Sequence, residues 1–203
     1  MNDTLNSNPE IKISILMHKQ DDPTKCTAEK LVKFKMAMQV NKIPFGHIIL
    51  DPFSKVILTN QDKQNIHGIC AIDCSWKLAI KTIKASKRPN VNNRKLPALL
   101  AGNPTNYAKL GILSTSEAIA AALYILGYKE NANEIMNKFK WGHTFIDLNH
   151  DILEDYSHVK EQKKIIEIEK EYFPNFKNYT FRAKMEKIFE KHLLPKGIIR
   201  KRG

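Results

Sequence analysis

The segment GICAID, residues 68–73, is an almost continuous apolar run that ends in an acid. Runs of this kind are typical of strands that are buried on both faces of a parallel sheet. In the first half of the chain, apolar runs alternate with helical patterns, which is the order expected of α/β proteins. The segment therefore predicts an α/β fold whose N-terminal half is a parallel sheet with flanking helices.

Patterns in the rest of this half predict further elements. Apolar or alternating runs predict four more strands, over residues 11–17, 46–52, 56–62 and 96–102. A helix is expected over 28–40, with Thr27 as its N-cap and with Leu31, Phe34 and Met38 on one face. Another is expected over 75–84, capped by Ser75, and residues 86–95 are expected to form a basic loop rich in Asn.

The second half of the chain has helical patterns throughout. Ser114 and Glu117 fit the capping box that opens a helix, and Gly127 would end this helix. Further helices are expected within 129–156, as one or two segments, and over 160–172 and 179–193. We therefore expect a disordered tail at 1–10, an α/β domain at 11–111 and a mainly helical domain at 112–203.

The charge balance indicates the class of partner. The 203 residues include 33 Lys and Arg against 21 Asp and Glu, so the net charge is +12 and the pI is about 9.5. Such a balance favours an anionic partner, with nucleic acid ahead of an anionic membrane. A Lys-rich composition of the whole genome is the alternative explanation. No stretch reaches eighteen apolar residues, so no membrane span is expected.

The cysteines and histidines argue against a metal centre. The chain has an odd number of cysteines, Cys26, Cys70 and Cys74, which favours free thiols in a reducing compartment. No C-x-x-C, H-x-x-x-H or H-E-x-x-H spacing is present, so a structural zinc site is not expected.

Three loops follow predicted strands and should meet at the carboxyl edge of the sheet, where ligands bind in such folds. They are residues 21–27, 73–76 and 101–117. The third loop is too long for a simple connection and ends at a capped helix, which favours binding of a carboxylate or phosphate. No G-x-G-x-x-G or Walker motif supports a dinucleotide site.

Two residues of these loops admit more than one role. Asp73 could be a general base, a ligand of an ammonium group, or a helix N-cap beside Ser75. Trp76 could belong to the core or could form the wall for a flat heterocycle or a sulfonium. His143 and His150 are expected to be structural or surface residues. A ligand with an adenine, an ammonium and a carboxylate would fit this edge, and so would others.

Four segments in order carry a resemblance to a known family. They are DDPTKCTAEKL, DCSW, LPALLAGNPTNYAKLGILSTSEAIAAALYILGY and FKWGHTFIDLN. On these segments the chain resembles the small-subunit ribosomal RNA aminocarboxypropyltransferases, which are ribosome-maturation enzymes of archaea and eukaryotes. It departs from the usual pattern at Gly102, where Ala is common, and at Ala108, where Gly is common; both residues are small, and activity should be retained.

The resemblance implies a fold, a reaction and a setting. The fold would be similar to the knotted SPOUT methyltransferases, with a trefoil knot that patterns alone would not suggest. The enzyme would transfer the 3-amino-3-carboxypropyl (acp) group of S-adenosylmethionine to the N3 imide nitrogen of a pseudouridine, often already N1-methylated, in small-subunit rRNA. It would act as a cytoplasmic monomer, also nuclear in a eukaryote, without a metal and without a membrane.

The resemblance also implies which residues bind the donor. Trp76 would cover the donor and turn its methyl away from the RNA, and Asp73 would lie by its charged end; these two are the implied catalytic residues. Leu50 and Pro52 would flank the adenine of the donor, and the backbone of Leu96 and Gly111 would form hydrogen bonds to the edge of that adenine. The carbonyl of Ile72 would bind the ribose hydroxyls. Thr27 and Thr115 would hold the amino acid part of the donor.

Basic residues near this edge are the expected RNA contacts, and the alternative for each is a solvated surface cation. They are Lys25, Lys30, Lys87, Arg88, Arg94 and Lys95. Two other functions remain open: a knotted rRNA methyltransferase that uses the same donor, and a non-catalytic assembly factor that binds RNA through its charge.

Overall fold

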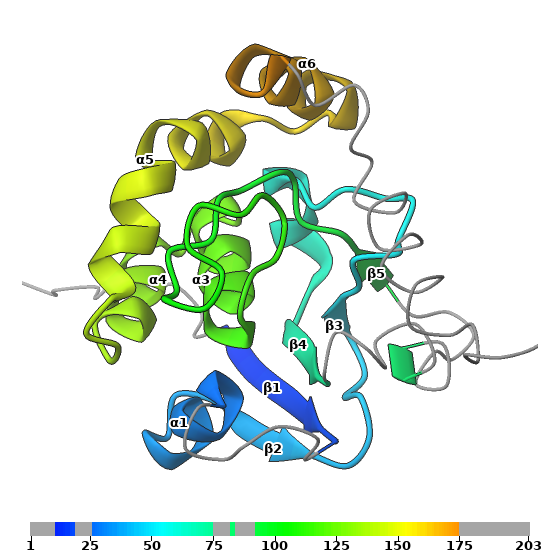
Figure 1. Ribbon diagram of the computed structural model, residues 1–203. Coiled ribbons are helices and arrows are strands. Elements are labelled where there is room, and N and C mark those ends of the chain that lie inside the picture. Colours follow the sequence, from blue (N-terminus) through cyan, green and yellow to red (C-terminus); the bar gives the residue numbers. More distant parts are fainter. Residues whose placement is uncertain (1–10, 19–25, 75–81, 84–91, 175–203) are drawn as a thin grey trace, which may run out of the picture.

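The computed structural model describes residues 11–18, 26–74, 82–83 and 92–174 (Figure 1). The expectations for the tail at 1–10 and for a helix at 179–193 lie outside these residues. The helix expected over 75–84 also lies outside them, except for Thr82 and Ile83, which are helical and buried.

The five described strands form one sheet in which every pairing is parallel, as predicted. Their order is β2-β1-β4-β3-β5. The strands are β1 (Lys12–Met17), β2 (Met38–Val40), β3 (His47–Leu50), β4 (Gly68–Asp73) and β5 (Asn92–Arg94). The GICAID segment is β4; it lies at the centre, and all but one of its residues are buried. The opening prediction is therefore confirmed.

The prediction of a helix over 28–40 is correct for its first turns and wrong for the remaining residues. Helix α1 covers Thr27–Lys33, and Lys35 then adopts a left-handed φ of 57° before β2 begins at Met38. Of the expected apolar face, Leu31 is fully buried, but Phe34 and Met38 are 46% and 56% exposed. Pairing of β2 with β1 supplies backbone hydrogen bonds that helical periodicity in the sequence could not anticipate.

The N-cap of α1 is also one residue from its expected place. Cys26 caps the helix, since its Sγ accepts a hydrogen bond from the backbone N–H of Glu29 at 3.4 Å. Thr27 is the first helical residue, so its hydroxyl is available for another partner.

The strand expected over 96–102 is absent from the sheet, and β5 instead lies in the expected loop at 86–95. The 96–102 segment is largely buried, as its apolar sequence predicts. Its backbone is satisfied by side chains: Ala98 N–H donates to Glu169, while both backbone groups of Leu100 bond to Asn149. Side chains here take the place of a neighbouring strand as hydrogen-bond partners, because buried backbone N–H and C=O groups need a hydrogen-bond partner.

The strand expected over 56–62 is likewise mostly wrong. Ile57 forms one parallel bridge with Lys95, and a 3-10 helix, η1 (Asn60–Asn65), follows. A capping box between Thr59 and Asp62 starts this helix, which explains why the polar end of the segment leaves the extended conformation.

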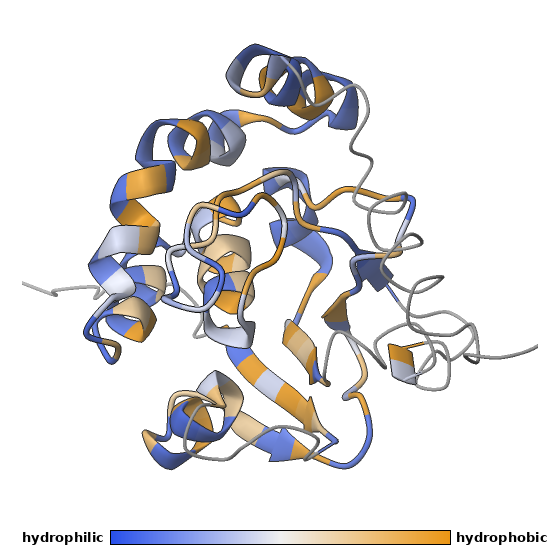
Figure 2. Cartoon of the chain, in the orientation of Figure 1, coloured by the Kyte–Doolittle hydropathy of each residue, from blue (hydrophilic) through white to orange (hydrophobic). Residues whose placement is uncertain are grey.

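The helical character of the second half is confirmed for its described residues, which end at 174. The helices are α3 (Thr115–Ile125), α4 (Lys129–Met136), α5 (Gly142–His158) and α6 (Gln162–Tyr172). Ser114 and Glu117 form the predicted capping box of α3. Helix α3 packs against β4, α1, α4 and α5, while α6 lies outermost and is mainly hydrophilic (Figures 1 and 2).

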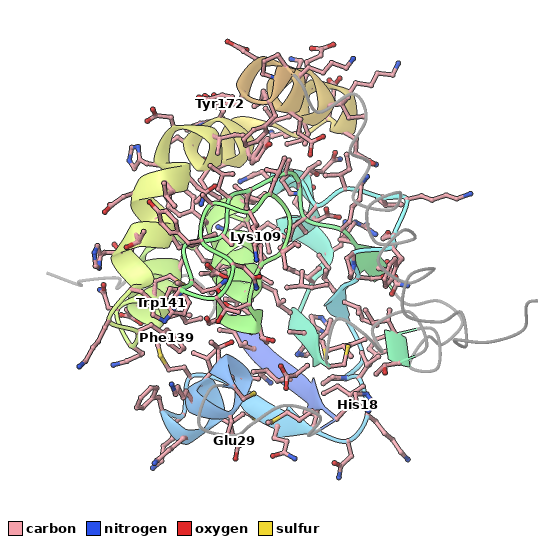
Figure 3. The ribbon with its side chains drawn as sticks, in the orientation of Figure 1. His18, Glu29, Lys109, Phe139, Trp141 and Tyr172 are labelled. Carbon is pink, nitrogen blue, oxygen red and sulfur yellow. The ribbon has the colours of Figure 1, made fainter. Side chains whose placement is uncertain are left out.

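The 129–156 segment forms two helices, which a turn at residues 137–141 separates just before Gly142. A Cβ at Gly142 would lie 1.8 Å from the carbonyl oxygen of Met136, so only glycine allows this approach. Phe139 and Trp141 meet at this turn with their ring centroids 5.3 Å apart (Figure 3).

One buried cluster joins the two halves, since it includes Ile15, Ile48 and Ile69 of the sheet together with Leu123 and Phe145 of the helices. The domain boundary expected between residues 111 and 112 stays a prediction, and the parts on either side of it share this core. Among the described residues, none of the helices is sufficiently long and apolar to span a membrane.

Candidate active site at the carboxyl end of β4

Asp73 is the last residue of β4 and lies between the starts of two helices. It is only 8% exposed. Its Oδ1 accepts a hydrogen bond of 2.8 Å from the hydroxyl of Thr115, and its Oδ2 accepts one of 3.4 Å from the thiol of Cys26. The carboxylate thereby joins the start of α3 to the N-cap of α1.

Thr27 makes a second link between these helices. Its Oγ1 accepts a hydrogen bond of 3.2 Å from the backbone N–H of Ser116. The N–H groups of the first helical turn have no acceptor within the helix, and that end of a helix favours negative charge. Thr27, Asp73 and Thr115, which were predicted on three different loops, are thus brought together, and they combine hydroxyl groups, a carboxylate and helix-end amides.

The thiol of Cys26 is a neutral hydrogen-bond donor in this arrangement. Burial, reinforced by the negative charge of Asp73, raises the pKa of Cys26 to about 11. Since the thiolate is the nucleophilic form of cysteine, Cys26 holds the carboxylate in place and is not suited to attack a substrate near neutral pH.

Glu117 fixes the long loop that leads into α3. It is fully buried, and its Oε1 accepts hydrogen bonds from the backbone N–H groups of Gly102 and Asn103, at 2.7 and 2.9 Å. Its Oε2 accepts from the Asn103 side chain at 2.7 Å and from Ser114 N–H at 2.6 Å. Both ends of the loop are therefore tied to the helix that carries Thr115.

The apolar residues expected to bind the donor lie along the same edge of the sheet. Leu50 ends β3 and pairs in register with Ala71 of β4, one residue before Ile72. Leu50 is buried, whereas Ile72 and Pro52 are partly exposed. Trp76, expected beside them, lies outside the described residues, so its two possible roles stay open.

The two backbone contacts expected for adenine differ in availability. Gly111 has a left-handed φ of 74°, and its N–H already donates to the carbonyl of Leu99 at 2.9 Å, which leaves only its carbonyl for a ligand. Leu96 is partly buried and packs against the core. Both assignments stay predictions.

Of the expected RNA contacts, Lys25, Lys87 and Arg88 lie outside the described residues. The guanidinium of Arg94 is engaged, because its Nε and Nη2 both lie 2.9 Å from Oδ1 of Asp62. Lys30 and Lys95 are partly exposed.

Sequence reasoning did not assign roles at this site to Cys26 and Glu117. The capping box identified Glu117 as a helix cap that accepts from Ser114 N–H, but two further backbone amides that it accepts from lie 14 and 15 positions away. All three cysteines are free, as expected. Among the described residues, the side chains of His, Cys, Asp and Glu form no group of three or more that could hold a metal ion.

Comparisons with known proteins identify the relatives of this chain. The profile of the family described as "Ribosome biogenesis protein, C-terminal" matches residues 48–173. The 16S rRNA aminocarboxypropyltransferase of Methanococcoides burtonii is 44% identical over 163 residues, which are 79% of this chain and 94% of that protein. The enzyme of the same name from Methanothermobacter thermautotrophicus is 42% identical over 167 residues, 80% of this chain and 98% of that protein.

A solved structure extends the match to three dimensions. The structure of the SAM-dependent rRNA:acp-transferase Tsr3 from Vulcanisaeta distributa has a TM-score of 0.79 and 39% sequence identity, and it covers 89% of this chain and 98% of that one. The chain belongs to the 16S rRNA aminocarboxypropyltransferase family. The resemblance drawn from the four sequence segments is thus confirmed, as is the parallel α/β architecture.

The two departures from the usual family sequence have local structural correlates. Ala108 has a left-handed φ of 56°, which is the conformation that glycine favours. Gly102 packs against α5, and a Cβ there would lie 2.5 Å from the backbone nitrogen of Phe145. The structure therefore gives a steric reason for glycine at position 102 and shows a conformational cost for alanine at position 108.

Proposed function

We propose that this protein transfers the acp group of S-adenosylmethionine to N3 of a pseudouridine, with or without an N1-methyl group, in small-subunit rRNA. The observation that carries the proposal is the convergence of Asp73, Thr115 and Thr27 at one sheet edge, in a chain of this family. The family assignment also weighs against the two alternatives, a methyltransferase and a non-catalytic assembly factor.

The described residues fit the charged part of this donor. Asp73 is a buried carboxylate whose two oxygens are held by neutral donors, so it complements a positively charged ammonium or sulfonium. The positive end of the α3 dipole complements a carboxylate, while the Thr115 hydroxyl, whose proton goes to Asp73, keeps lone pairs for an ammonium. The apolar Leu50 and Pro52 would flank the adenine from the neighbouring strand.

Positioning decides which group of the donor is transferred. When bound, the donor supplies an electrophilic carbon, and cleavage of its bond to sulfur releases methylthioadenosine while the attacking imide loses its proton. Asp73, Thr27 and Thr115 would hold the amino acid part so that its carbon chain is directed toward the RNA. Trp76 would cover the methyl side.

Asp73 is better suited to orient the donor than to remove a proton. Both of its oxygens accept hydrogen bonds, one from Thr115 and one from Cys26, and these bonds fix the orientation of the carboxylate. The imide of the target base is itself weakly acidic, so the reaction does not require a strong general base.

The substrate and setting follow from charge and family. A net charge of +12 suits a substrate rich in phosphates, and Lys30 and Lys95 are the described cations that we assign to it. Arg94 would have to exchange Asp62 for a phosphate. We further propose that the protein acts as a cytoplasmic monomer; light scattering during gel filtration would test its oligomeric state.

We also propose that the chain is knotted as a trefoil, as in SPOUT proteins. Two features support this: the buried 96–102 segment is hydrogen-bonded to side chains of α5 and α6, and Gly102 abuts the backbone of Phe145. An experimentally phased crystal structure tests it, because a fully traced chain that reduces to an unknotted line would contradict the proposal.

One experiment separates the proposed function from its alternatives. Purified protein is incubated with S-adenosylmethionine and small-subunit RNA that contains N1-methylpseudouridine, and the nucleosides are analysed by mass spectrometry. The expected product carries one acp group, and Asp73→Asn should abolish it. A product with one extra methyl group would indicate a methyltransferase. RNA binding without either product, and without measurable donor binding by calorimetry, would indicate the assembly factor.

A further inference from the structure

The loop between Ala101 and Leu113 presents a large aromatic ring to solvent. Tyr107 is 57% exposed. Among the residues that the structure describes, no side chain stacks on its ring and none is hydrogen-bonded to its hydroxyl. Burial of an aromatic side chain is strongly favourable, so a ring left uncovered on an ordered loop is available to a partner.

The backbone on both sides of Tyr107 is fixed by hydrogen bonds. Ala108 N–H donates to the carbonyl of Ala101 at 2.7 Å, and Ala101 N–H donates to the carbonyl of Lys109 at 3.0 Å. On the other side, Asn106 N–H donates to Oδ1 of Asn103 at 3.0 Å. A ring held on such a loop loses little conformational freedom when it binds a partner.

The loop is also attached to the candidate active site. The buried carboxylate of Glu117 accepts from Gly102 and Asn103 at one end of the loop and from Ser114 at the other. Thr115, which bonds to Asp73, is the next residue along the chain. The position of Tyr107 is therefore fixed relative to the site by hydrogen bonds of the same short segment.

A cation lies two positions from the ring. Lys109 is exposed, and its Nζ lies 3.2 Å from Oδ1 of Asn106 and 3.4 Å from the carbonyl of Thr105. Figure 3 shows Lys109 on the loop in front of α3. An ammonium has three donors, so a further acceptor can bind after these two contacts.

We propose that Tyr107 is a stacking platform for an unpaired base of the RNA substrate and that Lys109 binds an adjacent phosphate. An exposed aromatic ring beside a cation is the combination by which proteins bind single-stranded RNA, since every base has a π face and every linkage a charge. This inference rests on the proposed function. It assigns substrate binding to the loop that leads into α3, the helix that carries Thr115.

The test measures RNA and donor binding separately. The probe is a short RNA hairpin with one N1-methylpseudouridine in its loop, and affinity is measured by fluorescence anisotropy. Tyr107→Ala should weaken RNA binding by roughly 5- to 150-fold, the usual range for loss of one stacked base. Tyr107→Phe keeps the π face and should bind like the wild type. The affinity for S-adenosylmethionine, measured by calorimetry, should be unchanged in both variants.

Salt dependence distinguishes the two side chains. Lys109→Gln should reduce the slope of log K against log salt by about 0.7, the value for one phosphate on a single strand. Tyr107→Ala should leave this slope unchanged, because stacking releases no counterion. Tyr172→Ala is the matched control: Tyr172 is an exposed tyrosine on α6, well separated from Lys109 in Figure 3, and its removal should not affect RNA affinity.

Several results would overturn the inference while leaving the proposed function intact. One is equal RNA affinity of Tyr107→Ala and the wild type, with acp transfer by both. Another is equal loss for Tyr107→Ala and Tyr172→Ala. A third is unchanged affinity for free RNA with reduced modification of assembled pre-ribosomal subunits, which would assign the loop to a protein partner. Failure of the wild type itself to modify RNA would instead contradict the proposed function.

Discussion

The hydroxyl of Thr115 donates a hydrogen bond of 2.8 Å to Oδ1 of Asp73, which lies 42 positions earlier in the chain. The contact joins the first residue of α3 to the last residue of β4. It fixes the orientation of a buried carboxylate at the edge where parallel sheets bind ligands. Removal of either group should therefore weaken donor binding.

Thr115→Val tests this contact directly. Valine has nearly the same shape but no hydroxyl, so Asp73 loses a hydrogen bond of the charge-assisted type, about 1.5–3 kcal/mol. We expect an affinity for S-adenosylmethionine that is weaker by roughly tenfold or more in calorimetry. Thr115→Ser keeps the hydroxyl and is the control. Equal donor affinity of the Val and Ser variants would show that the hydroxyl is not needed.

Cys26 should resist alkylation until the solution is strongly basic. Burial, with a contribution from the charge of Asp73, raises its pKa to about 11. The rate of reaction with iodoacetamide, followed by peptide mass spectrometry, should therefore rise with pH toward a midpoint near that value. Asp73→Asn removes the negative charge and should move the midpoint to lower pH. A midpoint in the ordinary thiol range for the wild type would contradict this prediction.

His47 should make the protein less stable in mild acid. It is buried, and burial, together with nearby positive charge from His67 and Lys12, lowers its pKa. Its Nε2 also has no hydrogen-bond partner among the described residues. The unfolded chain then binds the proton more readily than the folded chain. The full contribution of His47 to stability is therefore present above the ordinary pKa of about 6.5, and it is lost as the pH decreases from there through the lower pKa of the folded state.

Urea unfolding between pH 8 and pH 5, values that bracket the ordinary histidine pKa, measures this effect. His47→Phe should remove part of the decrease in unfolding free energy at acid pH. Replacement of the exposed His150 by Asn should leave the decrease unchanged. The prediction fails if the His47→Phe protein loses as much stability in acid as the wild type.

Ala108→Gly should stabilise the protein. The left-handed φ of 56° at Ala108 costs a residue with a Cβ about 1–2 kcal/mol. Part of the gain from the change to glycine would be offset, because glycine loses more backbone conformational entropy than alanine on folding. We expect a net gain of about 0.5–1 kcal/mol in the free energy of unfolding, measured with urea. The same change at Ala118, inside α3, should destabilise by about 1 kcal/mol. Destabilisation by both changes would rule out the conformational explanation.

Gly102→Ala should have the opposite effect from Ala108→Gly. The new Cβ would lie 2.5 and 2.6 Å from the backbone N and Cα of Phe145, so α5 would have to shift. Such overpacking typically costs about 1–3 kcal/mol. Thermal and urea unfolding provide the measurement. An unchanged stability would mean that α5 moves freely relative to the loop.

The elements predicted best were those whose signal is contained in their own residues. The apolar run of β4 requires burial on both faces, and the Ser114–Glu117 pair satisfies the first turn of α3 whatever surrounds it. The position of Asp73 at a strand end follows from the same run. Fold class, the helical second half and this part of the candidate site were therefore accessible from the sequence.

The errors occurred where backbone groups find distant partners. Residues 96–102 are as buried as their sequence predicts, yet their hydrogen bonds go to Asn149 and Glu169 on α5 and α6. Residues 38–40 fit a helical pattern, but β1 is available to pair with them. Apolar patterning specifies that a segment is buried; it does not specify which partner satisfies its backbone.

The sequence by itself determined which residues are candidates for the chemistry: an acid at the end of a buried strand and hydroxyl groups at helix starts, in a strongly basic chain. Only the tertiary structure decided that Thr27 binds the amide of Ser116, that Cys26 donates to Asp73, and that Glu117 fixes the loop of Tyr107. These contacts join residues far apart in the chain, and their geometry exists only after the sheet and α3 have packed together.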